Sequence, residues 1–353
     1  MVVTANYDLF KLKLLPEMLH VFGRVLPGWE HVKIDKTLYS ADRKTRIILR
    51  SADAEGGLES ATAQAAWLDE CGQDKFKLSA WEAVQRRLSL SQGRVLATTT
   101  PYNMGWLKTE IFDRWTKGDG DYQVVQFKSI QNPAFPREEY ERAKATLPGW
   151  KFEMFYNGNF SKPAGMIYSD FNTETHVVKP FDVPAEWPRY VGIDFGAVNT
   201  ALVWLAHDQE KSCYVLYRES LSGDMTTAEH VRRARSNAKG ERVLIWAGGA
   251  KSERQQRMDW KHEGISVREP RVADVEAGID RVIELFKTGR LLIFDTCHGI
   301  IDELGTYSRE LDEMGQPTEK IKDKNDYHRL DALRYIAGHI DVATGISLIG
   351  WAS

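Results

Sequence analysis

The chain has little of what marks several protein classes. Its 353 residues include only three cysteines, Cys71, Cys213 and Cys297, which lie far apart and form no CxxC pair. Neither a disulfide framework nor a zinc site is therefore expected. No apolar run approaches membrane-spanning length and no signal pattern opens the chain, which predicts a soluble intracellular protein without a membrane partner. The formal net charge of −3 excludes a globally basic protein, but not a local basic face.

The order of apolar runs predicts two α/β domains. Up to about residue 160, strand-like runs alternate with helical ones, as in a parallel α/β sheet. Prolines and a glycine then punctuate a mixed segment that we interpret as a linker. Three closely spaced strand-like runs follow, suited to antiparallel neighbours, and helices then alternate with strands, which is the order of a ribonuclease-H-like domain with a mixed sheet. We expect domains at 1–162 and 189–342, a linker at 163–188 and a tail at 343–353.

Two aspartates are placed to hold divalent metal. Asp194 ends the strand-like run YVGIDFG, and Asp331 lies in the helical run YHRLDALRY, beside its apolar face. Two divalent ions roughly 3.5–4 Å apart activate water and stabilise the leaving oxygen of a phosphodiester, and Mg²⁺ prefers carboxylate oxygens. Singly, each aspartate is more typical of a turn or a surface ion pair, but together they favour a metal site. Gly192 and Gly196 flank Asp194, and we expect them to leave the backbone open to a bulky substrate.

Phrases spread over nearly the whole chain resemble the large subunit of tailed-phage terminases, the motor and nuclease that packages viral DNA. They are RSADAEGGLES, AAWLDECGQ, ATTTPYNMGWL, YVGIDFG, VEAGIDRVIELFKTGRLLIF, DELGTYSRELDE and YHRLDALRY, in the family's order from about Val2 to Ile340. The resemblance implies a Mg²⁺- or Mn²⁺-dependent endonuclease that cuts double-stranded DNA in the host bacterial cytoplasm. It also implies a portal protein, a terminase small subunit and further copies of the chain on the portal as partners.

By that resemblance the two aspartates are the first and last nuclease acids, and a third is missing from its usual place. Many family members have an aspartate just after the strand RVLIWA, where this chain reads Ala247-Gly248-Gly249. Glu253 is the preferred substitute, because paired glycines permit a turn that folds it back toward the sheet. As a first-turn acid, Glu253 is equally well explained by the helix dipole. Asp274, which begins the next long helix, is an alternative, and a site with only two carboxylates is another.

The first half carries the acids of an ATPase without its phosphate loop. In AAWLDECGQ, Asp69 and Glu70 fit the second acidic motif of a P-loop ATPase, where they would hold Mg²⁺ and orient the attacking water. Thr98 and Thr99 in ATTTPYN would sense the γ-phosphate. The motif GxxxxGK[ST], whose backbone N–H groups surround the phosphates, does not occur. We expect the chain to begin after that loop, to bind ATP only if the loop is supplied, and not to hydrolyse ATP appreciably alone.

Several basic residues near the expected site are candidates for contacts with DNA phosphates. They are Lys251, Arg254 and Arg257 around Glu253, and Lys320, Lys322 and Lys324 in EKIKDKNDYHR, which resembles a mobile loop that closes on DNA. For any one of them, solvated surface charge is the simpler explanation. The sequence leaves three roles open for His328, which are contact with phosphate, support of Asp331, or a place on the helix surface.

Three functions fit the sequence to different extents. The first is a terminase large-subunit endonuclease with an incomplete motor domain. The second is a catalytically weak or inactive prophage remnant that binds only DNA, portal or small subunit, which the missing acid and missing phosphate loop favour. The third is a free-standing resolvase of the same fold, which leaves AAWLDECGQ and ATTTPYN unexplained.

Overall fold

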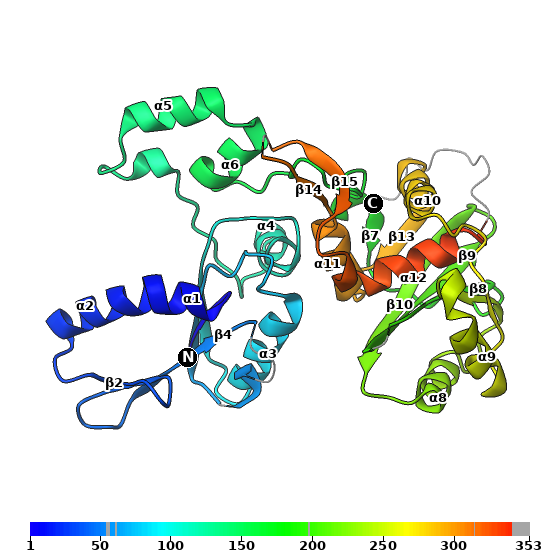
Figure 1. Ribbon diagram of the computed structural model, residues 1–353, viewed down its shortest axis with the longest axis horizontal. Helices are drawn as coiled ribbons and strands as arrows, with labels where there is room; N and C mark the ends of the chain where they lie inside the picture. The colour runs from blue at the N-terminus through cyan, green and yellow to red at the C-terminus, as the bar shows by residue number, and fades with distance from the viewer. Residues whose placement is uncertain (54–56, 61, 197, 314, 341–353) are drawn as a thin grey trace. The chain divides into compact units, whose positions relative to one another are not determined.

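The computed structural model describes residues 1–53, 57–60, 62–196, 198–313 and 315–340 (Figure 1). The chain divides into two compact units, Met1–Pro163 and Ala164–Ser353. No helix within the described ranges has the length and apolarity that a membrane crossing requires.

The first unit is built on a six-stranded sheet in the order β2-β3-β4-β1-β5-β6. Four strands are parallel, β4 (Arg46–Ser51), β1 (Val2–Thr4), β5 (Ala65–Asp69) and β6 (Arg94–Thr98). Two short strands, β2 (Glu30–Val32) and β3 (Thr37–Tyr39), extend one edge in antiparallel fashion. The alternation of strands and helices did not predict these two, because three residues are too few for a period-2 pattern to stand out.

Helices cover both faces of this sheet because its strands alternate apolar side chains between them. One face packs on α3 (Leu78–Leu88), where Val3 and Leu68 share a core with Trp81 and Val84. The other packs on a helical stretch made of α1 (Tyr7–Leu9), a π-helical turn (Phe10–Leu14) and α2 (Leu15–Val25). The remainder includes π-helical Leu107–Phe112, α4 (Asp113–Thr116), the 3-10 turn Ser129–Gln131, α5 (Arg137–Thr146) and α6 (Gly149–Asn157).

The second unit holds a seven-stranded mixed sheet in the order β12-β11-β8-β9-β10-β13-β7. Its centre is the antiparallel trio β8 (Arg189–Phe195), β9 (Asn199–Asp208) and β10 (Cys213–Gly223). Parallel strands extend it on both sides, β11 (Val243–Gly248) and β12 (Val267–Arg268) beyond β8, β13 (Leu291–Phe294) and β7 (Val177–Val178) beyond β10. The predicted fold class, a parallel α/β sheet followed by a ribonuclease-H-like mixed sheet, is confirmed.

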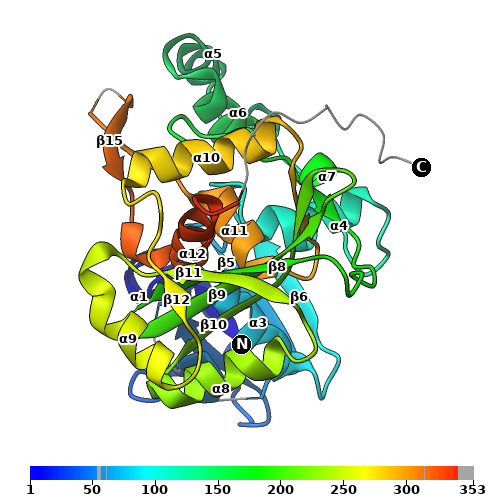
Figure 2. The same ribbon diagram turned by 90° about the vertical axis from the view of Figure 1, so that its right-hand side faces the viewer.

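Figure 2 shows that helices lie on both faces of this second sheet. On one side α10 (Val275–Lys287), α11 (His298–Thr306) and α12 (His328–Ala337) pack over the larger apolar core, with α7 (Thr173–His176) at its margin. On the other side lie α8 (Thr227–Asn237) and α9 (Arg254–His262). Thr226 caps α8 in a capping box with Glu229, as its place before an amphipathic run predicts.

The lysine-rich segment before α12 is ordered differently from the prediction. We expected a loop there, but β15 (Pro317–Ile321) pairs in antiparallel fashion with β14 (Arg309–Leu311). The 3-10 turn Lys324–Asp326 then leads into α12. Lys320 therefore lies in a strand. The alternating lysines mislead because charged residues are typical both of loops and of an exposed edge strand.

Candidate functional site

Asp194 lies where the sequence predicts, one residue before β8 ends. β8 is flanked on both sides by β9 and β11, so the position of its backbone is fixed by two ladders of hydrogen bonds. The carboxylate is 12% exposed, and its Oδ2 lies 2.8 Å from Nδ1 of His328. His328 therefore supports Asp194, rather than Asp331 as the sequence suggested.

The glycines beside Asp194 serve the packing of the protein. A Cβ placed on Gly192 would lie 2.1 Å from the carbonyl oxygen of Ala332 in α12. One placed on Gly196 would lie 2.0 Å from the carbonyl oxygen of Asn199. Gly192 is buried, so the prediction that it opens the backbone to a substrate is wrong, whereas for the half-buried Gly196 it stays a prediction. Gly192 instead lets the backbone of α12 rest directly on β8, which brings Asp331 over the end of that strand.

Asp331, on α12, is a half-buried acid next to the end of β8. Its Oδ1 accepts a hydrogen bond of 2.8 Å from Nη2 of Arg334, whose side chain is 3% exposed. Burial raises the pKa of Asp331, the charge of Arg334 opposes that rise, and the charge of Asp194 adds to it. The charge of Asp194 thus acts on Asp331, and α12 packs against β8 at Ala332, the residue that follows Asp331. The side chain of Arg334 fits there because α10 has a glycine, Gly278, beside it. A Cβ on Gly278 would lie 2.3 Å from Cγ of Arg334.

Glu253 folds back toward the same place. Its carboxylate accepts a hydrogen bond from the backbone N–H of Ala250, which closes the turn between β11 and α9. Burial raises the pKa of Glu253, and the charges of Asp194 and Asp331 add to this rise. The hydrogen bond from the Ala250 N–H lowers the pKa and so opposes the rise. The acid therefore caps a helical turn, as one of the two explanations expects, and the charges of both aspartates act on it.

The turn after β11 has no room for the aspartate that many terminases carry there. A Cβ on Gly248 would lie 2.0 Å from the carbonyl oxygen of Ile193, and one on Gly249 would lie 2.6 Å from the ring of Phe195. Gly249 also has a φ of +75°, which side chains rarely adopt. The absence of the acid is therefore built into the packing of β8 against β11.

The buried side chain of Arg257 hydrogen-bonds to the backbone of this turn. Nη1 of Arg257, on α9, donates to the carbonyl oxygens of Gly248, Gly249 and Ala250 at 3.3, 3.2 and 2.8 Å. Arg257 is only 8% exposed. The proposal that Arg257 contacts DNA is wrong, because its guanidinium is already used by the backbone.

Asp274, the alternative third acid, has another role. Its Oδ1 accepts the backbone N–H of Ala277 at 2.8 Å, so it caps α10.

A residue that the sequence did not single out is Tyr335, a buried side chain on α12. Burial raises the pKa of Tyr335 to about 12, and the charges of Asp331, Asp194 and Glu253 contribute. Its position one turn beyond Asp331 was the available signal.

The oxygen donors at this site match those that Mg²⁺ and Mn²⁺ prefer. Among the described residues no group of three or more His, Cys, Asp or Glu side chains is arranged to hold a metal ion. Each carboxylate is instead engaged by a donor of the protein, Asp194 by His328, Asp331 by Arg334 and Glu253 by a backbone N–H. Their mutual repulsion is what a bound cation would relieve. The assignment of these three acids as metal ligands stays a prediction.

The acids and threonines of the first half also gather at one sheet edge. Asp69 and Thr98 pair in register at the carboxyl ends of β5 and β6, and Oγ1 of Thr98 donates to Oδ1 of Asp69 at 2.7 Å. Glu70 follows with a φ of +52°. The Tyr102 hydroxyl lies 3.1 Å from Oε2 of Glu70. Thr99 accepts the N–H of Gly72 at 2.8 Å. Their roles toward a nucleotide stay predictions.

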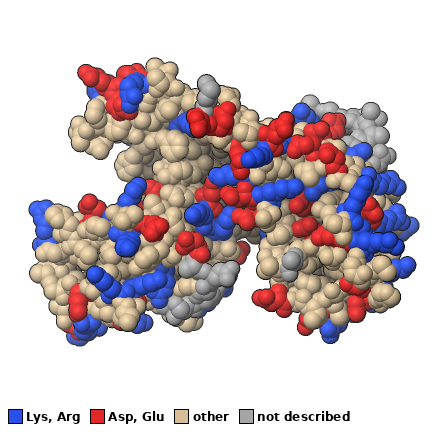
Figure 3. Space-filling view, viewed as in Figure 1, with Lys and Arg blue, Asp and Glu red and all other residues tan. Residues whose placement is uncertain are grey.

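The proposed DNA-binding residues differ in how available they are. Figure 3 shows Lys and Arg side chains gathered at the edge of the second unit beside β8 and α9. Lys251 and Arg254, at the start of α9, are exposed. Lys320 and Lys324 are exposed, whereas Lys322 is half-buried and its backbone N–H bonds to Ser308. Lys324 lies near enough for its charge to lower the pKa of Asp331.

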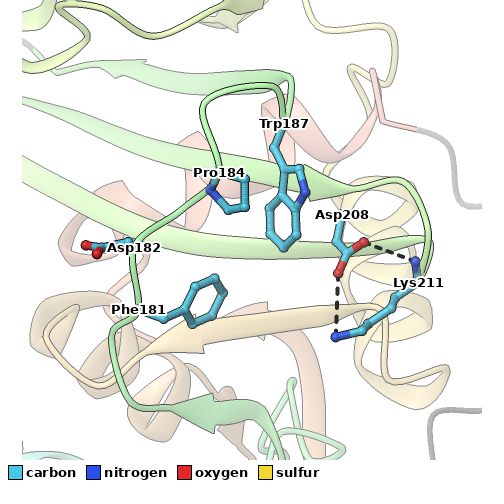
Figure 4. A pocket seen from close by; sticks show the side chains of 6 residues that line it. All are labelled: Phe181, Asp182, Pro184, Trp187, Asp208 and Lys211. Atoms are coloured by element: carbon cyan, nitrogen blue, oxygen red, sulfur yellow. Dashed lines mark hydrogen bonds and ion pairs between the residues drawn. The ribbon is translucent and has the colours of Figure 1, made fainter.

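A shallow hollow elsewhere in this unit contains none of the predicted site acids. It has a volume of about 330 Å³ and is lined by Phe181, Asp182, Pro184, Trp187, Asp208 and Lys211 (Figure 4). Asp208 ends β9, which runs antiparallel to β8, so the hollow lies at the opposite edge of the sheet from Asp194.

The contact between His328 and Asp194 predicts a pH-dependent stability. The hydrogen bond to Asp194 raises the pKa of His328 above its ordinary value of 6.5, although burial opposes. A raised histidine pKa stabilises the folded state fully below the unfolded pKa, and this stabilisation is lost as the pH rises through the folded pKa. In metal-free urea titrations we expect the free energy of unfolding of wild type to exceed that of H328Q by about 1–2 kcal/mol near pH 5.5. Near about pH 9 this difference should be much smaller. A difference that is constant with pH would contradict the charged contact.

Comparison with known proteins places these sites in context. No family model matches the chain. Its sequence is 24% identical over 289 residues to the terminase large subunit of Escherichia phage T5, which covers 76% of this chain and 63% of that protein. The chain is related to the large subunits of phage terminases. It spans less than two thirds of the length of the curated relative that it matches.

Two solved terminase structures are similar to this terminase-related chain. The large terminase of bacteriophage HK97 is 14% identical, with 96% of this chain and 84% of that chain covered and a TM-score of 0.43. The nuclease domain of the P22 large terminase is 26% identical over 50% of this chain and 92% of its own, with a TM-score of 0.41.

Proposed function

We propose that the second unit is a divalent-metal-dependent endonuclease that cuts double-stranded DNA during phage genome packaging. The observation that supports it is that Asp194, Glu253 and Asp331 lie on adjoining elements, since β11 pairs with β8 and α12 packs on β8. They come from β8, the turn after β11 and α12, and the charges of Asp194 and Asp331 act on Glu253. Carboxylates are costly to crowd together in a protein unless a cation joins them.

Each residue of the site has a defined task in this proposal. Asp194, Asp331 and Glu253 would hold Mg²⁺ or Mn²⁺, which when bound supplies an activated water and stabilises charge on the phosphate. His328 fixes the orientation of the Asp194 carboxylate through its 2.8 Å contact. Lys251, Arg254 and Lys324 bind and orient the phosphate backbone, and Lys320 and Lys322 extend that path along the β14–β15 pair.

A plasmid assay tests the proposal directly. Supercoiled DNA is incubated with the protein and Mn²⁺ or Mg²⁺, and the products are separated on a gel. We expect nicked and linear forms with metal, and none after chelation with EDTA. Supercoiled DNA that persists at ample protein and metal would remove the endonuclease proposal.

The substitution E253Q tests whether Glu253 is the third ligand. Glutamine keeps an oxygen that accepts the Ala250 N–H, so the turn is retained, but the charge is lost. We expect the Mn²⁺ concentration for half-maximal cleavage to rise about tenfold, which corresponds to about 1.4 kcal/mol of metal binding. The matched control is E263Q, an exposed glutamate at the end of α9. An unchanged metal requirement in E253Q would indicate a site with two carboxylates.

A catalytically inactive remnant is the second proposal, and two observations favour it. The third acid is missing from its usual place, and no metal-binding group is preformed among the described residues. Such a protein would bind DNA, portal protein or small subunit without cutting. Gel retardation of DNA together with an intact plasmid would support it.

The first unit is proposed to be an incomplete ATPase domain. Asp69, Glu70, Thr98 and Thr99 would face Mg²⁺ and the phosphates of ATP if a phosphate loop were supplied. We propose that this chain alone does not turn over ATP. The whole assembly would include portal protein, small subunit and further copies of the chain in the host bacterial cytoplasm.

A further inference from the structure

A half-buried carboxylate lies at the beginning of α11 and a buried one at the beginning of α12, and each comes from another element. Glu219, on β10, accepts the backbone N–H groups of Gly299 and Ile300 in the first turn of α11, both at 2.7 Å. The residue before that helix, Cys297, makes no capping bond with its side chain. Glu219 therefore supplies the acceptor that the free N–H groups of a helix start require.

Glu303 does the same for α12. It is 6% exposed on α11, and its Oε2 accepts the backbone N–H of Leu330 at 3.0 Å. Tyr327, at the cap position of α12, makes no capping bond with its side chain. The first turn of α12 is thus held to α11 through Glu303, by a carboxylate at the end of the helix where the dipole favours negative charge.

Arg329 joins the two carboxylates. Its Nη1 lies 3.0 Å from Oε1 of Glu303, and its Nε lies 3.3 Å from Oε2 of Glu219. The guanidinium occupies space that only a glycine leaves free, because a Cβ on Gly299 would lie 2.3 Å from its Cζ. The cluster therefore joins β10, α11 and α12.

This cluster lies between the two site residues of α12. Arg329 and Leu330, which it holds, are the residues that separate His328 from Asp331 in the chain. A shift or rotation of the first turn of α12 would move both, because His328 and Asp331 are three positions apart on the helix. The 2.8 Å contact between His328 and Asp194 depends on that first turn.

Stability alone does not account for such a cluster. Burial raises the pKa of Glu303 to about 8 although the charge of Arg329 opposes, so keeping the charged group inside opposes folding. Buried ionic clusters are often replaced by apolar residues of similar size without loss of stability. What an apolar pair cannot supply is an acceptor for the Leu330 N–H and a fixed direction for the helix start.

We propose that Glu303 and Arg329 are positioning residues that set the first turn of α12, and through it the places of His328 and Asp331 opposite Asp194. The inference rests on the proposed function for its activity readout. Glu303 and Arg329 take no part in the reaction in this proposal, because their described contacts are with Glu219, Leu330 and each other.

The test is the double substitution E303L/R329M, compared with E284L/K287M on the exposed side of α10. We expect the melting temperature of E303L/R329M to fall, because Glu219 and the Leu330 N–H lose their partners, so cleavage is compared at a temperature at which both proteins are folded. The Mn²⁺ concentration for half-maximal plasmid cleavage should rise at least about tenfold, as is typical when partners of metal ligands are removed. The conservative variant E303Q, which keeps an acceptor for Leu330, should recover most of that loss. The control pair should match wild type in both measurements.

Metal-free crystal structures of wild type and E303L/R329M provide a second readout that does not depend on cleavage. Separation of His328 from Asp194 in the variant supports the inference, even if wild type proves unable to cut DNA. An unchanged contact with an unchanged metal requirement would overturn it. If E303L/R329M does not fold, G299A displaces the Arg329 guanidinium with both charges present, and the same two outcomes decide.

Discussion

The substitution D194N should abolish metal-dependent cleavage of plasmid DNA. Asparagine has nearly the shape of aspartate, so β8 and its contact with α12 should be retained while the charge that binds metal is lost. We expect the rate to fall by on the order of a thousandfold, which corresponds to about 4 kcal/mol of transition-state stabilisation. The loss should persist at saturating Mn²⁺, measured as the initial rate of supercoiled plasmid consumption.

The matched control for D194N is D274N. Asp274 belongs to the same unit and has been considered as a metal ligand, but its carboxylate caps α10. Asparagine caps helices about as well as aspartate, so cleavage by D274N should remain near wild type. Activity retained in D194N, or lost in D274N instead, would contradict the placement of the site at the end of β8.

The second large effect is expected from G248D, which inserts an acid at the turn where many terminases have one. A Cβ at this position would lie 2.0 Å from the carbonyl oxygen of Ile193, so β8 and β11 would have to separate. We expect a loss of roughly 3 kcal/mol or more in the free energy of unfolding. The added carboxylate should therefore abolish cleavage instead of strengthening the metal site.

The control for G248D is S252D, which adds the same charge to an exposed position of the same turn. Its free energy of unfolding should stay within about 0.5 kcal/mol of wild type, measured by urea titration followed by circular dichroism. A G248D protein as stable as wild type, with a lower Mn²⁺ requirement, would show that the turn can take the missing acid after all.

The roles of glycines and of long basic side chains were the hardest to predict from the sequence. Gly192 and Gly196 were interpreted as openings for a substrate, but a Cβ added to either would meet the backbone, at Ala332 and at Asn199 respectively. Arg257 was grouped with exposed cations, but it is buried under the turn after β11. A glycine or an arginine has the same local signature whether a ligand or the protein's own backbone occupies the space beside it.

The elements themselves were accessible because their signals are local. The central strands β8, β9 and β10 follow from apolar runs with short gaps, and α10 follows from its periodicity between a capping Asp274 and Gly289. The short strands β2 and β3 and the β14–β15 pair were missed. Strands of three to five residues carry too few alternations to be distinguished from loops.

By itself the sequence determined the fold class, the order of the elements, and the positions of Asp194 and Asp331 at the end of a strand and on the last described helix. These follow from periodicities and caps that act over a few neighbouring residues. The tertiary structure alone decided that His328 contacts Asp194, and that Glu219, Glu303 and Arg329 hold the starts of two helices. Such contacts join residues up to 134 positions apart, and they depend on how α12 packs across the sheet, which no local pattern encodes.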